Sequence, residues 1–429
     1  MEAIIERCCG LDVHQATVVA CVLVGKAHEK PKKEIRTFGT FRRDLEALAE
    51  WMRSHGVTHV AMESTGVYWE PIYAVLEGAF EIIVGNPRRI KNVPGRKTDV
   101  CDAQWIADLA RHGLIAKSFV PPKPLRELRA LLRYRTKLVQ SRTAERNRLQ
   151  ALLERANIKI ASVITDIFGV SGMLMLKALV DGSMKPAEIS KLARGKLRSK
   201  IPTLESALDG RLQEHHRFML RLQLKRLQAV DDDIAELEQD IDQKLAPYKP
   251  AMELLTQIPG VDWVVAAVLV AEIGTDMTVF GSPTRLASWA GVCPGNNESA
   301  GKKKSSRATK GNAHLRAILV QGAVAAARQK GSYFRDKYYR LKARRGANRA
   351  ALAIAHKLLV AVYHMLSSGQ PYKELGDAYL DSLSKRRVTN SLVERLERLG
   401  YNVSLQPKVA TSPGAPSGPT PPPGHEQLQ

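Results

Sequence analysis

Short apolar runs alternate with amphipathic helical patterns over the first third of the chain. Five runs predict strands, at Cys8–His14, Thr17–Val24, Lys33–Phe41, Val57–Glu63 and Glu81–Val84. Apolar residues recur every three or four positions in Arg42–Ser54 and Tyr68–Ala79, which predicts two helices between the later strands. Three strands followed by alternating helices and strands indicate an α/β layer domain over residues 1–120. Their order suggests a ribonuclease H-like sheet.

After Pro121–Pro124 the pattern becomes helical. Leu125–Ile160 is predicted to be one long helix, and Leu204–Leu245 a second, with shorter helices and basic loops between them. The two long helices predict either an antiparallel coiled coil or a dimer contact, and their pattern does not choose between these. Residues 121–250 are therefore expected to form a coiled-coil helical domain.

Residues 251–385 predict a third, mostly helical domain. Leu254–Asp262 leads into the apolar helix Val264–Ile273, a helix-hairpin-helix-like pattern whose backbone N–H groups would suit a DNA phosphate. Asp262 stands where a second glycine is usual, and its carboxylate would repel phosphate, so a helix N-cap in a plain packing turn is the alternative. Beyond about Arg386 order is expected to fade, and the Pro-rich tail within 386–429 is predicted to be disordered.

The charge of the chain adds a prediction about its partners. The sequence has 65 Lys and Arg residues but only 43 Asp and Glu residues, which gives a formal net charge of +22. Such a surplus favours a polyanionic partner, above all nucleic acid. The first long helix is strongly basic, which indicates phosphate contact by Arg126, Arg129, Arg133, Arg135, Lys137, Arg142, Arg146, Arg148 and Arg155.

Two further observations concern the compartment. No apolar run is expected to approach the roughly 20 residues that span a membrane, so no membrane partner is predicted. The five cysteines form no CxxC pair and are odd in number, which fits a reducing cytoplasm and gives no zinc site. This predicts a cytoplasmic protein.

Four carboxylates occupy unusual positions. Asp12 lies within the first predicted strand, Glu63 ends the fourth, and Asp99 and Asp102 lie three residues apart where a helix begins. Taken singly, each has an ordinary explanation, either a solvent-facing edge or a helix cap. Taken together, they favour a shared cation, and oxygen-only ligands suit Mg²⁺ or Mn²⁺. Two such ions would stabilise both sides of a phosphoryl displacement.

A polar loop in the third domain contains a candidate nucleophile. Ser299 lies just upstream of the cation run Lys302–Lys304. A serine that attacks phosphate needs an exposed hydroxyl and positive charge around the developing oxyanion. The alternative is a flexible basic loop that binds the nucleic-acid backbone without chemistry.

Several motifs carry a family resemblance: GLDVHQ (Gly10 to Gln15), MESTGVYWEP (Met62 to Pro71), the Val84 to Leu109 stretch, IPGV…AEIG (Ile258 to Gly274) and AGVCPGNNESAGKKK…TKGNAHLR (Ala290 to Arg316). They resemble the DEDD-type insertion-sequence transposases, also called bridge-RNA-guided recombinases, which include the pilin-gene invertases. The resemblance covers roughly residues 8 to 365.

The resemblance implies a RuvC-like domain whose carboxylates Asp12, Glu63, Asp99 and Asp102 bind Mg²⁺. It also implies a transposase domain, residues 251–385, with a catalytic serine that becomes joined to DNA. Ser299 matches best, but Ala300 separates it from Gly301, which leaves the register open, with Ser305 as the weaker alternative.

The partners that the family implies are double-stranded donor and target DNA, a noncoding guide RNA and further copies of the chain, as a dimer or tetramer. The expected function is a transposase that cuts and rejoins DNA through phosphoserine. One alternative is a metal-dependent, RuvC-like structure-specific endonuclease in which water attacks. Another is a nucleic-acid-binding scaffold without chemistry.

Overall fold

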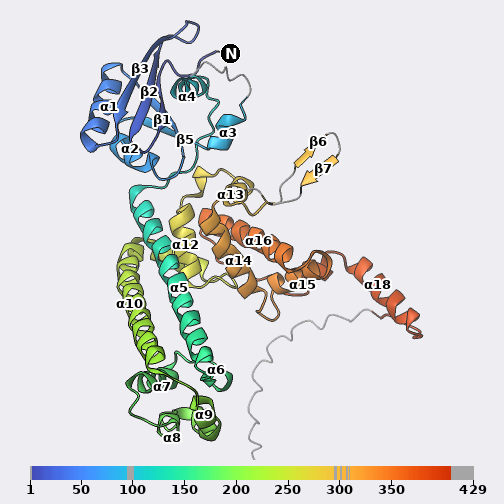
Figure 1. Ribbon diagram of the computed structural model, residues 1–429. Helices are drawn as coiled ribbons and strands as arrows, with labels where there is room; N and C mark the ends of the chain where they lie inside the picture. The colour runs from blue at the N-terminus through green and yellow to red at the C-terminus, as the bar shows by residue number, and fades with distance from the viewer. Residues whose placement is uncertain are drawn as a thin grey trace, which may run out of the picture.

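Figure 1 shows a computed structural model of the chain, with a sheet at one end, two long helices and a group of shorter helices. It describes residues 2–93, 101–293, 297–299, 302–305, 308 and 310–406. For 297–299 and 302–305 the description covers the backbone alone. Asp99 and the last part of the Pro-rich tail, residues 407–429, lie outside the described residues.

All five predicted strands are present and form one mixed sheet. They are β1 (Arg7–Val13), β2 (Thr17–Val24), β3 (Lys32–Gly39), β4 (His59–Glu63) and β5 (Glu81–Gly85), in the spatial order β3-β2-β1-β4-β5. β1, β2 and β3 are antiparallel neighbours, whereas β4 pairs in parallel with both β1 and β5. The mixed α/β layer expected from the order of elements is therefore confirmed.

Helices cover both faces of the sheet (Figure 1). Because side chains alternate along a strand, Cys9 and Leu11 face the core formed with α1 (Arg42–Ser54) and α2 (Trp69–Leu76). Cys8 faces the opposite side, where it packs with Ala103 of α4 (Asp102–Arg111). The short helix α3 (Pro87–Lys91) contributes Ile90 to that second face.

The two long helices lie side by side and antiparallel (Figure 1). α5 (Lys123–Arg155) and α10 (Glu214–Leu245) are joined by ion pairs in reversed order, since Arg135 meets Glu238 and Arg142 meets Asp231 further back along α10. The two helices therefore form an antiparallel pair within one chain, and the coiled-coil packing and the dimer contact stay predictions.

Both long helices are shorter than predicted, for one shared reason. α5 ends at Arg155, and Asn157 has a left-handed φ of 56°, so Ile160–Val163 forms a separate helix α6. Leu204–Leu245 is divided into α9 (Ile201–Leu208) and α10, because the chain turns at Gly210 against the end of α5. A Cβ at Gly210 would lie 2.7 Å from the carbonyl oxygens of Ala156 and Asn157, so the tight approach requires glycine.

Four helical segments complete the far end of the pair (Figure 1). They are α6, α7 (Val170–Asp181), α8 (Pro186–Ser190) and α9, with a 3₁₀ turn η1 (Gly195–Lys200) before α9. Their apolar residues form a separate core with Leu149, Leu153 and Leu220.

The remaining helices form the largest core together with the start of α5. They are α11 (Lys249–Leu255), α12 (Trp263–Ile273), α13 (Pro283–Ala290), α14 (Ala313–Ala326), α15 (Tyr333–Arg345) and α16 (Ala347–Ser368), with 3₁₀ turns η2 (Ala246–Tyr248) and η3 (Met277–Val279). After α17 (Tyr379–Ser382), residues Lys385–Arg398 form α18, which buries none of its side chains. The chain is therefore still helical where a loss of order is predicted from about Arg386.

The turn before α12 distinguishes the two interpretations of Asp262. Its Oδ1 accepts a hydrogen bond from the Val265 N–H at 2.8 Å, which makes it the N-cap of α12. Gly260 is in a left-handed conformation, and a Cβ there would lie 2.2 Å from the Gly322 carbonyl oxygen of α14. The turn therefore packs against α14, and the expected N-cap is confirmed.

One helix departs from the expected lack of long apolar runs. Within the described residues, α16 is long and apolar enough to cross a membrane by length and composition alone, so that expectation was wrong for this segment. Its Ala350, Ile354 and Leu358 are fully buried, and Ile354 and Leu358 lie in the core shared with α12 and α14. This packing is that of the central helix of a folded domain.

Candidate active site

Asp12 and Glu63 lie side by side at one edge of the sheet. The parallel register of β1 and β4 pairs Leu11 with Met62, so the next residue of each strand is a carboxylate on the same face. Both are half-buried, and the Asp12 side chain is 27% exposed. Because their strands are direct neighbours, the two carboxylates are held close together by the sheet itself.

Asp102 is brought to the same edge by the packing of α4 on β1. A Cβ at Gly10 would lie 2.2 Å from the Ala103 carbonyl oxygen and 2.3 Å from the Ala107 nitrogen, so the helix rests directly on the strand. Gly10 and Asp12 share one face of β1, and Asp102 immediately precedes Ala103. The first turn of α4 therefore carries its exposed carboxylate to the face on which Asp12 and Glu63 lie.

The electrostatics of Glu63 reflect this grouping. Burial raises the pKa of the Glu63 carboxyl, the Lys91 ammonium lowers it, and the negative charges of Asp102 and Asp12 raise it further. Thr65 Oγ1 donates to Glu63 Oε2 at 3.5 Å. Asp12 and Asp102 thus both act on Glu63, although the three carboxylates come from three separate elements.

These oxygen donors suit a hard divalent cation in their chemistry. The ring nitrogen Nε2 of His14 lies 3.1 Å from Asp12 Oδ2, so an imidazole also borders the acids. Among the described residues, no three His, Cys, Asp or Glu side chains are already drawn close enough together to hold a metal ion. Asp99, the fourth predicted acid, lies outside the described residues.

The structure describes Ser299 through its backbone alone. It ends β6 (Asn297–Ser299), which pairs antiparallel with β7 (Lys302–Ser305), and Ser299 is opposite Lys302. The weaker candidate, Ser305, is opposite Asn297 in the same hairpin. In Figure 1 the β6–β7 hairpin lies apart from the five-stranded sheet.

The arginines of α5 are used differently from what their sequence predicts. Six of the nine basic residues assigned to phosphate contact are ion-paired within the chain, namely Arg126, Arg129, Arg133, Arg135, Arg142 and Arg148. Carboxylates of the same chain therefore offset part of this positive charge, with Arg129 and Arg133 sharing the single charge of Glu272, and phosphate contact along the whole helix stays a prediction. The acidic second half of α10 was the signal that could have revealed part of this pairing.

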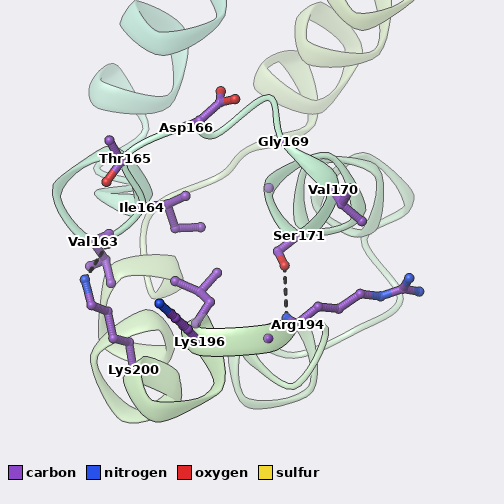
Figure 2. Close-up of a pocket in the computed structure, with 13 residues that line it drawn as sticks. Val163, Ile164, Thr165, Asp166, Gly169, Val170, Ser171, Arg194, Lys196 and Lys200 are labelled. Atoms are coloured by element: carbon purple, nitrogen blue, oxygen red, sulfur yellow. Dashed lines mark hydrogen bonds between the residues drawn. The ribbon is translucent and has the colours of Figure 1, made fainter. Parts of the chain in front are cut away.

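Exposed cations are found instead at the far end of the helix pair. A hollow of about 630 Å³ is lined there by residues that include Arg194, Lys196 and Lys200. Figure 2 shows these side chains around it, with the backbone N–H of Arg194 donating to Ser171 Oγ at 2.9 Å. This basic tip, defined by the three cations, lies at the opposite end of α5 from the sheet (Figure 1).

Two family models match the chain. One, described as a transposase, matches residues 9–158, and the other, described as the transposase IS116/IS110/IS902 family, matches residues 252–339. The first match contains the three grouped carboxylates, and the second contains the β6–β7 hairpin.

Curated relatives agree with these matches. The transposase for insertion sequence element IS1111A of Coxiella burnetii is 27% identical over 297 residues, which cover 67% of this chain and 72% of the relative. A probable family 20 transposase of Pseudomonas aeruginosa is 26% identical over 328 residues, covering 73% and 85%. The insertion element IS110 uncharacterized 43.6 kDa protein of Streptomyces coelicolor is 28% identical over 314 residues, covering 67% and 75%.

Proposed function

This chain belongs to the DEDD-type insertion-sequence transposase family, and from that premise we propose that it cuts and rejoins DNA through a covalent phosphoserine at Ser299. The observation that carries the proposal is the grouping of Asp12, Glu63 and Asp102 at one sheet edge. The strand order β3-β2-β1-β4-β5 supports a RuvC-like assignment for this domain.

The acids are assigned to divalent-cation binding. Asp12, Glu63, Asp99 and Asp102 would hold Mg²⁺, or Mn²⁺, through oxygen atoms alone. A bound divalent cation neutralises phosphate charge and stabilises the attacking and leaving oxygens of a displacement. Burial is the main cause of the raised pKa of Glu63, and the negative charges of Asp102 and Asp12 add to it, so a cation bound among these carboxylates would offset their repulsion.

The serine performs the covalent chemistry. Ser299 Oγ loses its proton and attacks phosphorus, the bond from phosphorus to the sugar oxygen breaks, and the leaving oxygen takes up a proton. A sugar hydroxyl of the new strand then attacks the phosphoserine and restores the serine hydroxyl. Each step exchanges one phosphate ester for another, so rejoining consumes no ATP.

The partners follow from charge and from the family. Double-stranded donor and target DNA are the substrates, a noncoding guide RNA is the proposed source of specificity, and further copies of the chain complete the active site. A net charge of +22 supports a large nucleic-acid load. Because six arginines of α5 are ion-paired within the chain, the basic tip is assigned a share of that contact.

The test is adduct formation by the full chain on DNA that carries its element ends, with Mg²⁺ present. Ser299→Ala should abolish the protein–DNA adduct on denaturing gels while DNA binding persists, and Ser305→Ala should leave the adduct intact. An adduct that survives Ser299→Ala removes Ser299 from the role. An adduct that disappears only in Ser305→Ala would transfer the role to Ser305.

The same assay separates the alternatives. Strand cleavage without any covalent adduct would favour a nuclease that uses water, since that reaction needs the acids and not the serine. Unchanged transposition in cells by Asp12→Asn combined with Asp102→Asn would favour a binding scaffold without chemistry.

A further inference from the structure

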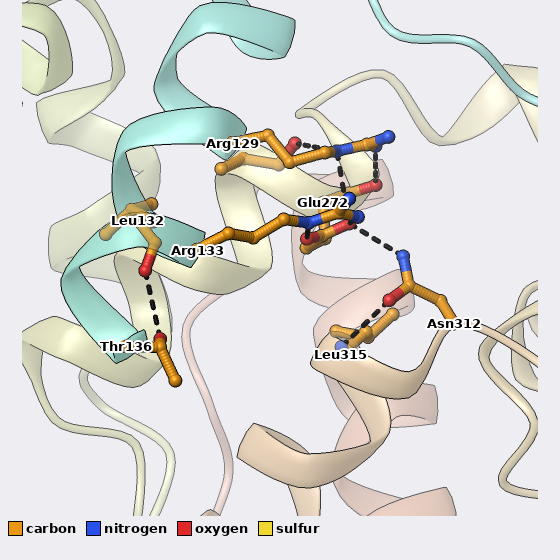
Figure 3. Close-up of polar contacts among 8 residues, drawn as sticks. Arg129, Leu132, Arg133, Thr136, Glu272, Asn312 and Leu315 are labelled. Atoms are coloured by element: carbon orange, nitrogen blue, oxygen red, sulfur yellow. Dashed lines mark hydrogen bonds and ion pairs between the residues drawn. The ribbon is translucent and has the colours of Figure 1, made fainter. Parts of the chain in front are cut away.

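A buried carboxylate outside the proposed acid site connects three parts of the molecule. Glu272 in α12 is 2% exposed, and Arg133 of α5 donates to it from Nε at 2.8 Å and from Nη2 at 2.9 Å. The Nε of Arg129 lies 3.1 Å from Glu272 Oε2, and the Nη2 of Arg129 donates to the Glu272 carbonyl oxygen at 2.7 Å. Figure 3 shows the two guanidinium groups converging on this one carboxylate.

Asn312 completes what we call the Glu272 cluster, formed by Arg129, Arg133, Glu272 and Asn312. Its Nδ2 donates to Glu272 Oε2 at 2.6 Å, and its Oδ1 accepts from the Leu315 N–H at 3.0 Å as the N-cap of α14 (Figure 3). Both ends of the amide are therefore used, which fixes its orientation. Asn312 is also the point at which the chain returns from the serine segment, residues 294–309, into the helical core.

The residues that flank that segment on its two sides are in contact with each other. The Asn312 N–H donates to the Trp289 carbonyl oxygen at 3.2 Å. A Cβ at Gly311 would lie 2.3 Å from the Gly291 nitrogen, so the returning chain passes directly over the departing one. The Glu272 cluster consequently holds the residues on both sides of the serine segment through Asn312.

The same stretch of α5 also reaches the domain that carries the acids. Arg126 donates to both oxygens of Glu77, at 2.9 and 2.6 Å, beside α2. Arg126, Arg129 and Arg133 are spaced by three and four residues, so they share one side of the helix. The helix α5 thus connects the α/β domain, through Arg126, with the Glu272 cluster.

We infer that Glu272 and Asn312 are positioning residues for the nucleophile Ser299. They hold the chain at the point where it leaves the segment that carries this serine. The inference rests on the proposed role of Ser299. Breaking the Glu272–Asn312 hydrogen bond should slow the covalent step more than it weakens DNA binding, because a misplaced group reacts slowly even when its substrate is bound. A role in stability alone would instead lower the melting temperature and leave the rate of the folded protein unchanged.

Asn312→Asp separates these two roles. Aspartate caps a helix as well as asparagine does, but it cannot donate to Glu272 and would place a second carboxylate against it. Combining Asn312→Asp with Glu272→Gln exchanges donor and acceptor, so the hydrogen bond is restored. The matched control is Glu238→Gln. Glu238 lies in α10 and accepts a hydrogen bond at 2.7 Å from Arg135, which lies in α5 like Arg129 and Arg133. The control therefore disturbs an arginine pair of α5 outside the Glu272 cluster.

The experiment measures single-turnover adduct formation by the full chain at saturating DNA, well below the melting temperature of each variant. Asn312→Asp should slow the adduct step by about 10- to 100-fold with DNA affinity within about twofold of wild type. The double variant should recover most of the rate, and Glu238→Gln should match wild type. A wild-type rate in Asn312→Asp, or a double variant no faster than the single one, would overturn the inference.

A second readout does not depend on the reaction. Trypsin cleavage after Lys302, Lys303 and Lys304, mapped by mass spectrometry on DNA-free protein, should be faster in Asn312→Asp than in wild type or Glu238→Gln. If wild-type protein forms no adduct, the proposed function fails, and this readout still tests whether the cluster holds the segment. Equal cleavage in all three proteins would then refute the inference.

Discussion

Gly10 of β1 and Ala103 of α4 approach each other so closely that a Cβ at Gly10 would lie 2.2 Å from the Ala103 carbonyl oxygen. Asp12 follows two residues after the glycine, and Asp102 immediately precedes the alanine. The close approach therefore fixes how far the first turn of α4 lies from the acid on the strand. A residue with no functional group sets the geometry of the candidate site.

Gly10→Ala is expected to displace α4 and to destabilise the protein. Overpacking of a close backbone contact costs about 1–3 kcal/mol of stability, and more where neither backbone segment can shift. Urea unfolding should show a lower midpoint, and Mg²⁺ should stabilise the variant less than wild type. The control is Gly169→Ala, where a Cβ would lie an ordinary 3.4 Å from the Asp166 carbonyl oxygen and the midpoint should change far less.

Glu63→Gln is expected to abolish catalysis and to raise the melting temperature at pH 7 without metal. Because the folded state raises the pKa of Glu63, ionisation there is less favourable than in the unfolded chain. The stabilising effect of its proton is present below the unfolded pKa and disappears as pH rises through the folded pKa. The advantage of the variant should therefore shrink as pH falls through the raised pKa, and vanish below the ordinary value of 4.5.

Metal dependence supplies the matching measurement for Glu63. Mg²⁺ should raise the melting temperature of wild type at pH 7 and have a smaller effect on Glu63→Gln, because one ligand is gone. Equal responses of the two proteins would argue against Glu63 as a ligand.

Asp262→Ala is expected to lower the free energy of unfolding by about 1 kcal/mol, because the N-cap of α12 is removed. Asp262→Asn should stay within a few tenths of a kcal/mol of wild type, because asparagine also caps. Denaturant titration measures both. If Asp262→Ala kept full stability and bound DNA more tightly with a steeper salt dependence, the phosphate-binding interpretation would return.

Nucleic-acid affinity should depend on the basic tip more than on the paired arginines. Lys196 and Lys200 are exposed, so replacing each by alanine should reduce the slope of log affinity against log salt by about 0.9 for each phosphate that the lysine neutralises. Arg142→Ala should change the slope less, since Arg142 already pairs with Asp231. Binding titrations at several salt concentrations decide this, and the reverse order of effects would contradict the assignment.

The local patterns of the sequence predicted much of the fold. All five strands, the helices on the sheet and the two long helices follow from apolar spacing, which depends on neighbours a few residues away. Asp12 and Glu63 also stood out, because an acid inside or at the end of an apolar strand is visible without a structure. The breaks at Asn157 and Gly210 were not predicted, since each exists only where the end of α5 meets the chain that leads into α10.

The sequence by itself determined the elements, the surplus of positive charge and the candidate acids and serine. Only the tertiary structure decided which charges meet: Asp12 with Glu63 and Asp102, six arginines with acids of the same chain, and Glu272 with Asn312. The physical reason is range. Helix and strand periodicity are set by adjacent turns and residues, whereas an ion pair or a shared carboxylate edge depends on groups that only folding brings within a few ångströms of one another.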